Sequence, residues 1–163
     1  MSDPFFDACE VHFAFLKSDY GCKGASKQRH SWGERFSTQN KTTGVVVTLE
    51  NRGLIVLVQL ARLMKGEIVM PVGEIRPDTE LFTFDLDDLV FLKGGRPGPS
   101  PKGENVLLNA VLGQAYNLKT YAGEVLAGNF QVFADLDKVV KQRAKEMAFQ
   151  KWGAQAEKFG WKR

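Results

Sequence analysis

The sequence of 163 residues is poor in the side chains on which most enzyme chemistry depends. It holds only two histidines, His12 and His30, and two cysteines, Cys9 and Cys22. Nucleophilic catalysis needs a serine or cysteine beside a base and an orienting group. No GxSxG, HExxH, dinucleotide-binding or zinc-ligand spacing is present. We therefore expect a protein that is not an enzyme and that carries no cofactor and no metal.

The sequence also lacks a long apolar run. A membrane-spanning helix needs about 18 apolar residues, and the best stretch, residues 53–64, is short and contains Gln59 and Arg62. The first 16 residues are interrupted by acidic side chains, unlike a secretory signal. These features predict a soluble cytoplasmic protein. A single cysteine pair does not favour a disulfide there, and Cys9 is expected to be buried as a small apolar side chain.

Charge of one sign is scarce in each of three segments, although the net charge of the chain is only +3. Residues 17–41 contain six bases and two acids, a local charge of +4. Residues 67–88 contain seven acids and one base, a local −6, and residues 138–163 contain eight bases and two acids, a local +6. The sequence therefore predicts an electrically polarised molecule. Charges spread along the last helix favour a solvated face over a nucleic-acid surface.

Helical periodicity marks the start of the chain. Asp3 before Pro4 has the pattern of an N-cap followed by proline in the first turn, and Gly21 is suited to end the helix. The apolar residues between them recur at helical spacing: Phe5, Phe6, Cys9, Phe13 and Leu16. The polar segment that follows, residues 22–41, is predicted to be a loop leading into an edge strand.

Two apolar runs rich in β-branched residues and leucine, residues 42–50 and 54–63, are joined through Asn51, Arg52 and Gly53, a composition typical of a hairpin turn. Residues 67–73 and 81–84 are predicted to add further strands. Such short connections exclude parallel pairing. The sheet is therefore expected to be an antiparallel meander.

The stretch FDLDDLVFL, residues 84–92, places three aspartates before an apolar helical pattern. Asp85 occupies the expected N-cap position, and Asp87 and Asp88 then complement the positive end of the helix dipole. The stretch lacks the glycine and terminal glutamate of a calcium loop. Nothing supplies the separated environments of a catalytic carboxylate pair. We interpret the aspartates as helix-starting residues, with docking of a partner as an added role.

A Gly/Pro connector at residues 94–103, which does not match a phosphate-binding loop, leads to two C-terminal helices. The first is predicted over residues 106–126 with a stop at Gly128. The second begins at Phe133 and is expected to point seven residues inward: Phe133, Leu136, Val139, Val140, Ala144, Met147 and Ala148. Gly153 and Gly160 weaken the pattern, so the tail 153–163 is expected to fray. The whole chain, 1–163, is predicted to be one α+β domain, an antiparallel β-meander packed against the N-terminal and long C-terminal helices.

This order of parts resembles a group of small bacterial proteins. The resemblance rests on the aromatic N-terminal helix closing on FLKSDYG, the hairpin GVVVTLENRGLIVLVQLARL, the segment FTFDLDDLV, and YAGEVLAGNF before a basic helix. Many members are similar to immunity proteins of polymorphic toxin and contact-dependent growth inhibition systems. The resemblance implies a cytosolic inhibitor that binds one cognate toxin domain and blocks its active site. The motifs are structural, so they imply no catalytic residues.

Many toxins of this kind are nucleases with basic clefts, which an acidic surface is suited to fill. The local charge of −6 therefore suggests a toxin-binding surface, and the basic C-terminal helix is the alternative docking face, for an acidic toxin. The candidate partner-binding residues are Glu74, Asp78, Glu80, Asp87 and Asp88.

Two other functions remain open from the sequence. One is an α+β nucleic-acid-binding module, in which the basic segment 17–41 and the C-terminal helix hold the backbone while Trp32 and Phe36 stack on bases. Strands rich in aliphatic residues argue against it, and pinning a long loop to the core is the more common use of a tryptophan such as Trp32. The other is an enzyme that uses Cys22 or His30, which predicts a reactive thiol or a titration near neutral pH.

Overall fold

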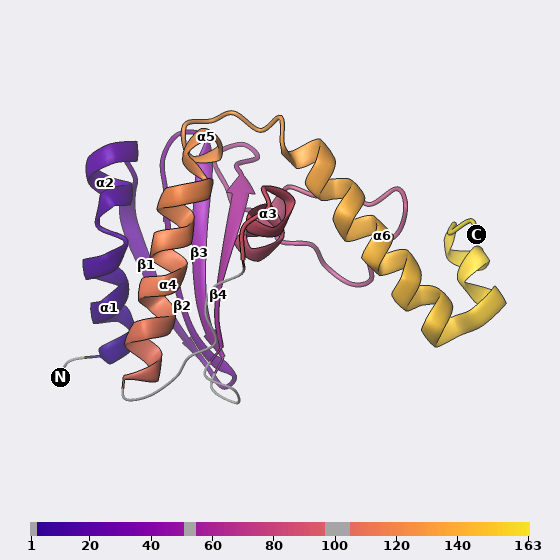
Figure 1. Ribbon diagram of the computed structural model, residues 1–163, viewed down its shortest axis with the longest axis horizontal. Coiled ribbons are helices and arrows are strands. Elements are labelled where there is room, and N and C mark those ends of the chain that lie inside the picture. Colours follow the sequence, from indigo (N-terminus) through magenta and orange to yellow (C-terminus); the bar gives the residue numbers. More distant parts are fainter. Residues whose placement is uncertain (1–2, 51–54, 97–104) are drawn as a thin grey trace.

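The computed structural model describes residues 3–50, 55–96 and 105–163. Five antiparallel strands form one sheet in the order β1-β2-β3-β4-β5, with helices against one face (Figure 1). The elements are α1 (Pro4–His12), α2 (Phe15–Tyr20), β1 (Lys23–His30), β2 (Gly33–Gln39), β3 (Thr43–Glu50), β4 (Ile55–Arg62), β5 (Thr83–Asp85), α3 (Leu86–Leu92), α4 (Val106–Tyr121), α5 (Gly123–Leu126), α6 (Phe133–Trp152) and the 3₁₀ helix η1 (Gly153–Phe159). The predicted α+β class and antiparallel meander are confirmed.

The centre of the sheet is the predicted hairpin of β3 and β4. Alternate residues of the two strands pair across the ladder and are buried toward the helices: Val45 with Leu60, Val47 with Val58, and Leu49 with Val56. This pairing of inward-facing residues fixes the register, because a slip of one residue would turn Val45, Val47 and Leu49 to the other face. The predicted hairpin turn at 51–53 and most of the connector 94–103 lie outside the described residues.

Residues 22–41 are predicted from their polar composition to be a loop leading into an edge strand. They contain instead the hairpin of β1 and β2, with β1 at the edge of the sheet. All eight residues of β1 are exposed, so this edge strand shows no apolar alternation that a sequence pattern could reveal. Its partner β2 buries Phe36, which stacks on Phe13 of the N-terminal helical segment with 6.5 Å between ring centroids. The edge strand is therefore held by backbone pairing and by polar contacts rather than by its own apolar side chains.

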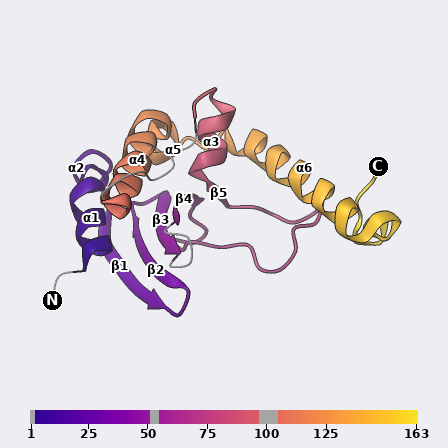
Figure 2. The same cartoon turned by 60° about the horizontal axis from the view of Figure 1, so that its bottom comes forward.

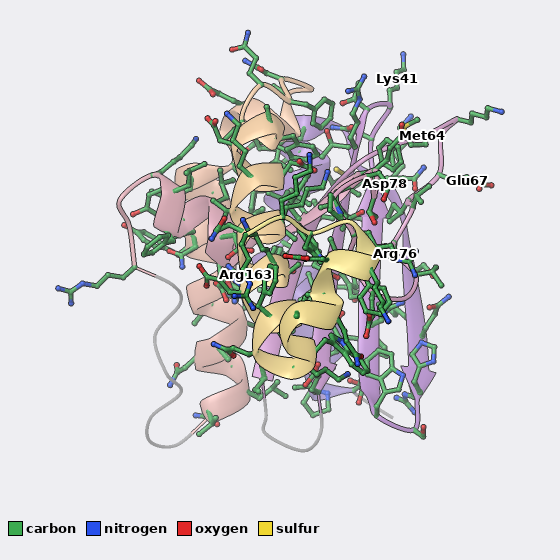
Figure 3. All side chains as sticks on the ribbon, turned by 90° about the vertical axis from the view of Figure 1, so that its right-hand side faces the viewer. Lys41, Met64, Glu67, Arg76, Asp78 and Arg163 are labelled. Carbon is green, nitrogen blue, oxygen red and sulfur yellow. The ribbon has the colours of Figure 1, made fainter. Side chains whose placement is uncertain are left out.

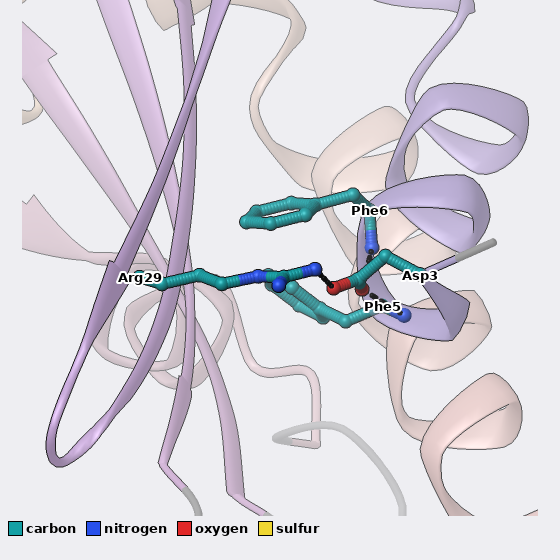
Figure 4. A network of polar contacts seen from close by, with 4 residues as sticks. All are labelled: Asp3, Phe5, Phe6 and Arg29. Carbon is teal, nitrogen blue, oxygen red and sulfur yellow. Dashed lines mark hydrogen bonds and ion pairs between the residues drawn. The ribbon is translucent and has the colours of Figure 1, made fainter. Parts of the chain in front are cut away.

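Those polar contacts join β1 to α1 (Figure 4). Asp3 caps the helix as predicted: its Oδ1 accepts hydrogen bonds from the backbone N–H groups of Phe5 at 3.0 Å and Phe6 at 3.1 Å. Its other oxygen accepts a hydrogen bond from the Arg29 guanidinium, which lies 5.9 Å from the centroid of the Phe6 ring. One carboxylate thus starts the first helix and ties the edge strand to it.

The N-terminal helical segment ends at Gly21 as predicted, where the backbone is left-handed with φ 70°. It is interrupted, however, at Phe13 and Ala14, so that it forms two short helices, α1 and α2. Phe13 turns into the core at this break, and Cys9 is fully buried as predicted. The interruption follows from packing, which the helical spacing of the apolar residues does not report.

Residues 63–82, here called the strap, connect β4 to β5 across the outer face of the sheet. The strand predicted at 67–73 is absent from the strap, which contains an isolated bridge between Met64 and Glu67 instead. Ile68 lies instead over Gly44, where a Cβ atom would come within 2.5 Å of it. The strand predicted at 81–84 is confirmed in part, since β5 begins at Thr83.

The C-terminal half departs from the prediction in how it packs. The helix predicted over 106–126 divides at Ala122 into α4 and α5. The last helix, α6, is confirmed, but only Phe133 and Leu136 of its predicted inward residues are buried. Beyond them α6 runs away from the sheet (Figures 1 and 2), and Met147 is 62% exposed. No helix of the described residues combines the length and apolar character needed to cross a bilayer.

Candidate functional site on the projecting arm

The helices α6 and η1 together form what is here called the arm. The strap runs beside the outer half of the arm, and the two enclose an apolar hollow of about 550 Å³. The walls come from three places: residues 73–76 of the strap, one side of α6, and the end of the chain. The lining residues are Gly73, Glu74, Ile75, Arg76, Ala144, Met147, Ala148, Gln150, Lys151, Trp152, Phe159 and Trp161.

The hollow exists because the chain reverses after α6. Gly153, with φ 56°, ends the helix in a conformation that favours glycine and lets η1 turn back. Within the tail predicted to fray, Ala156 is fully buried and Trp161 is 7% exposed. At its far end, Gly160 lies against Pro77 of the strap, since a Cβ atom added to this glycine would lie 3.6 Å from the proline ring.

Aromatic rings and cations alternate around this hollow. The rings of Trp152 and Phe159 lie 6.0 Å apart. The Lys151 ammonium is 4.8 Å from the Trp152 ring centroid, and the Arg76 guanidinium is 5.4 Å from that of Phe159. Trp152 is still 38% exposed. This cluster of aromatic, methionine and arginine side chains, of which Trp152, Met147 and Arg76 are exposed, has the composition of a protein-binding hot spot.

The acidic residues predicted to bind a partner fall into two groups. Glu74, Asp78 and Glu80 are exposed on the strap, and Figure 3, which looks onto the end of the arm, shows Asp78 above Arg76 on this side. Asp87 and Asp88 lie in the first turn of α3 and are half-buried. The five residues therefore do not form one continuous exposed surface.

The α3 group serves the fold. Asp88 accepts two hydrogen bonds from Arg143 of α6, at 2.5 and 3.3 Å, and this bond raises the pKa of the arginine. Asp87 accepts a 3.4 Å hydrogen bond from the buried Gln114 of α4. The strap is joined to the arm more loosely, with 3.9 Å between Glu74 and Lys151. Two acids of segment 67–88, Asp88 and Glu74, are thus paired with bases of segment 138–163.

Asp85 holds the predicted N-cap position, with extended backbone at φ −71° and ψ 136°, but its side chain makes no capping bond. Its Oδ1 accepts a hydrogen bond from the Gln59 amide at 3.2 Å instead. Burial, with the nearby charge of Asp88, raises the pKa of Asp85 above its ordinary value of 3.8. The carboxylate form is therefore less stable in the folded protein than in the unfolded chain.

Replacing Asp85 by asparagine is accordingly expected to stabilise the protein near neutral pH. Because the pKa of Asp85 is higher in the folded protein than in the unfolded chain, its contribution to the free energy of unfolding is fully present below the unfolded-state pKa. That contribution is lost as the pH rises through the folded-state pKa. Asparagine keeps the oxygen that Gln59 contacts and cannot ionise. Thermal unfolding should show a higher Tm for Asp85→Asn at about pH 7 and almost none of this gain at about pH 3. The exposed Asp78→Asn is the control, and an equal gain at both pH values would contradict the explanation.

The residues considered for other chemistry are placed differently. Cys9 and Cys22 are buried free thiols, and burial raises the pKa of each. His30 stacks on Trp32 with 4.6 Å between ring centroids, while Phe36 is only 4% exposed. The pair proposed to stack on bases is therefore not presented together on the surface. Within 3–50, 55–96 and 105–163, no group of three or more His, Cys, Asp and Glu residues is placed to hold a metal.

The apolar residues of the hollow are not found from the sequence: helical spacing predicts Met147 in the core, and the pattern indicates no role for Trp152 and Phe159. The available signal was the gathering of three aromatic residues, Trp152, Phe159 and Trp161, in a basic tail. The fold and this hollow define an α+β meander protein with a projecting arm. Comparison with protein-family models, curated proteins and solved structures gave no significant match.

Proposed function

We propose that this protein is an immunity-type inhibitor that binds and neutralises one cognate toxin domain. The observation that carries the proposal is the exposed aromatic hollow on the arm, away from the sheet and its core. Exposed apolar surface bordered by charge is typical of a protein-interaction site. An inhibitor needs such a surface and needs no reaction centre.

The strap supplies the charge part of the proposed interface. Asp78 and Glu80 are exposed, and neither belongs to an ion pair within the described part of the chain. Acidic side chains of this kind speed association with a basic cleft through long-range attraction. Asp88 contributes less, because its carboxylate already binds Arg143. The proposed contact surface is thus the strap and the hollow rather than α3.

The direct test is co-expression with the product of the gene immediately upstream, the expected position of a cognate toxin. A tagged copy of this protein should co-purify with that product in a defined stoichiometry, and growth should be rescued only when both are made. If the upstream product is not toxic and forms no complex, the proposal is overturned, and labelled single-stranded DNA and RNA are then titrated across a salt series.

Reversing the strap charges should slow binding of the toxin. For Asp78→Lys with Glu80→Lys, we expect an association rate constant about tenfold lower at low salt, with the difference disappearing near 0.5 M salt because screening removes the attraction. The rates are measured by surface plasmon resonance on the purified pair. The matched control, Asp19→Lys with Glu50→Lys, makes the same charge change on exposed residues away from the arm. Equal association rate constants for the two double variants would show that the strap is not part of the interface.

A further inference from the structure

We infer that the hollow binds an aromatic or large aliphatic side chain carried by an acidic segment of the partner. This inference rests on the proposed function and specifies the chemistry of the bound segment. The hollow, at about 550 Å³, lies within the size range of sites that bury a compact ligand, about 300–1,000 Å³. Its lining combines the small side chains Ala144 and Ala148 with Ile75 and Met147. Such walls favour an apolar anchor.

The chemistry around the anchor follows from the cations at the rim. Lys151 and Arg76 are each held against an aromatic ring, so their charges are positioned before a partner arrives. Figure 3 shows Arg163 on the same side of the molecule as Arg76. Three more cations of the arm, Lys145, Lys158 and Lys162, take part in no ion pair among the residues that the structure describes.

Against these cations the lining contributes one acid, Glu74, whose carboxylate is 3.9 Å from the Lys151 ammonium. Both side chains of this pair are more than half exposed, so the contact is weak and open to competition. Carboxylates of a bound segment would therefore meet Lys151 and Arg76 without having to break a strong pair.

Intrinsic fluorescence gives a direct measurement. The chain has three tryptophans, and two of them, Trp152 and Trp161, line the hollow. In a Trp32→Phe background, all tryptophan emission reports on this site. The probes are two nine-residue peptides with a central Phe-Leu pair, one flanked by Glu and Asp and the other by Lys.

The acidic peptide is expected to change the emission and to bind at least tenfold more tightly than the basic one at low salt, with affinity falling as salt is added. Met147→Asp, which places a carboxylate at the mouth of the hollow, should lower the affinity for the acidic peptide at least tenfold. Tyr116→Asp, at a 70% exposed position on α4, is the matched control and should leave binding unchanged. Equal response to both peptides, or no response to either, would overturn the inference.

The same variants separate this inference from the proposed function. If Met147→Asp binds the toxin as tightly as the unmodified protein does, the hollow is not the contact and the inference fails, while the immunity function stands. If the unmodified protein binds the acidic peptide but neither binds nor neutralises the toxin, the proposed function fails and the assignment of the hollow is retained.

Discussion

Replacing Asn40 by alanine is expected to lower the free energy of unfolding by roughly 3 kcal/mol, because one side chain joins three parts of the fold. Its Oδ1 accepts hydrogen bonds from the backbone N–H groups of Thr42 and Thr43, at 2.9 and 2.8 Å, and so shapes the turn between β2 and β3. Its amide donates to the carbonyl oxygens of Tyr20 and Leu126, both at 3.0 Å. Alanine would leave all four backbone groups without this partner.

Urea unfolding followed by circular dichroism measures the loss, and two variants identify its origin. Asn40→Asp keeps the acceptor for the turn but loses the donors, so it should be nearly as damaging at neutral pH. Thr42→Ala removes two contacts of an exposed hydroxyl, with Asn40 at 3.2 Å and with the Thr43 hydroxyl at 3.1 Å, and keeps the ties to Tyr20 and Leu126, so it should cost less than about 1 kcal/mol. A loss of similar size for Asn40→Ala and Thr42→Ala would show that the ties to Tyr20 and Leu126 contribute little.

The parts of the fold that sequence analysis predicted correctly are those in which a pattern reports burial directly. In β3 and β4, runs of β-branched residues and leucine are largely buried, as at Val47 and Val58, so the runs mark both strands. Asp3 and Gly21 also act locally, through backbone groups a few residues away. Such signals depend on neighbours in the chain and can be read without the tertiary structure.

The errors arose where distant residues determine the outcome. In β1, Lys27 and Arg29 face α1 and bind Glu10 and Asp3, contacts that give a polar strand its place without any apolar period. In α6, helical spacing correctly predicted the helix, but periodicity shows only that residues share a side. Whether Met147 is buried depends on a covering layer, and the strap covers it only in part.

The candidate site was hidden for the same reason. Glu74 and Lys151 are 77 positions apart in the sequence and become neighbours only when the strap lies beside the arm. Sequence analysis selected Asp87 and Asp88 with the strap acids because all are acidic, and the structure gives Asp88 an internal partner in Arg143. Composition thus identified charge, while tertiary contacts decide which charges remain available to another protein.

Replacing Gly33 by alanine is expected to destabilise the protein by about 3 kcal/mol, since backbone atoms occupy the space that a side chain needs. A Cβ atom at this position would lie 1.8 Å from the carbonyl oxygen of Leu49 and 2.9 Å from its carbonyl carbon. Gly33 pairs with His30 in β1 and with Glu50 in β3, so the clash falls where three strands meet. No flexible side chain is available to move aside.

Gly24→Ala is the matched control, because Gly24 also has a positive φ, 62°, but nothing lies within 4 Å of its Cβ position. It should cost only the strain of a left-handed alanine, about 1–2 kcal/mol. Urea unfolding gives the two losses, and amide hydrogen exchange should show faster exchange along β1 and β2 in Gly33→Ala. Because this hairpin lies away from the arm, the folded fraction of Gly33→Ala should still bind the toxin with unchanged affinity. Weaker binding by the folded fraction would instead place the interface on β1 and β2.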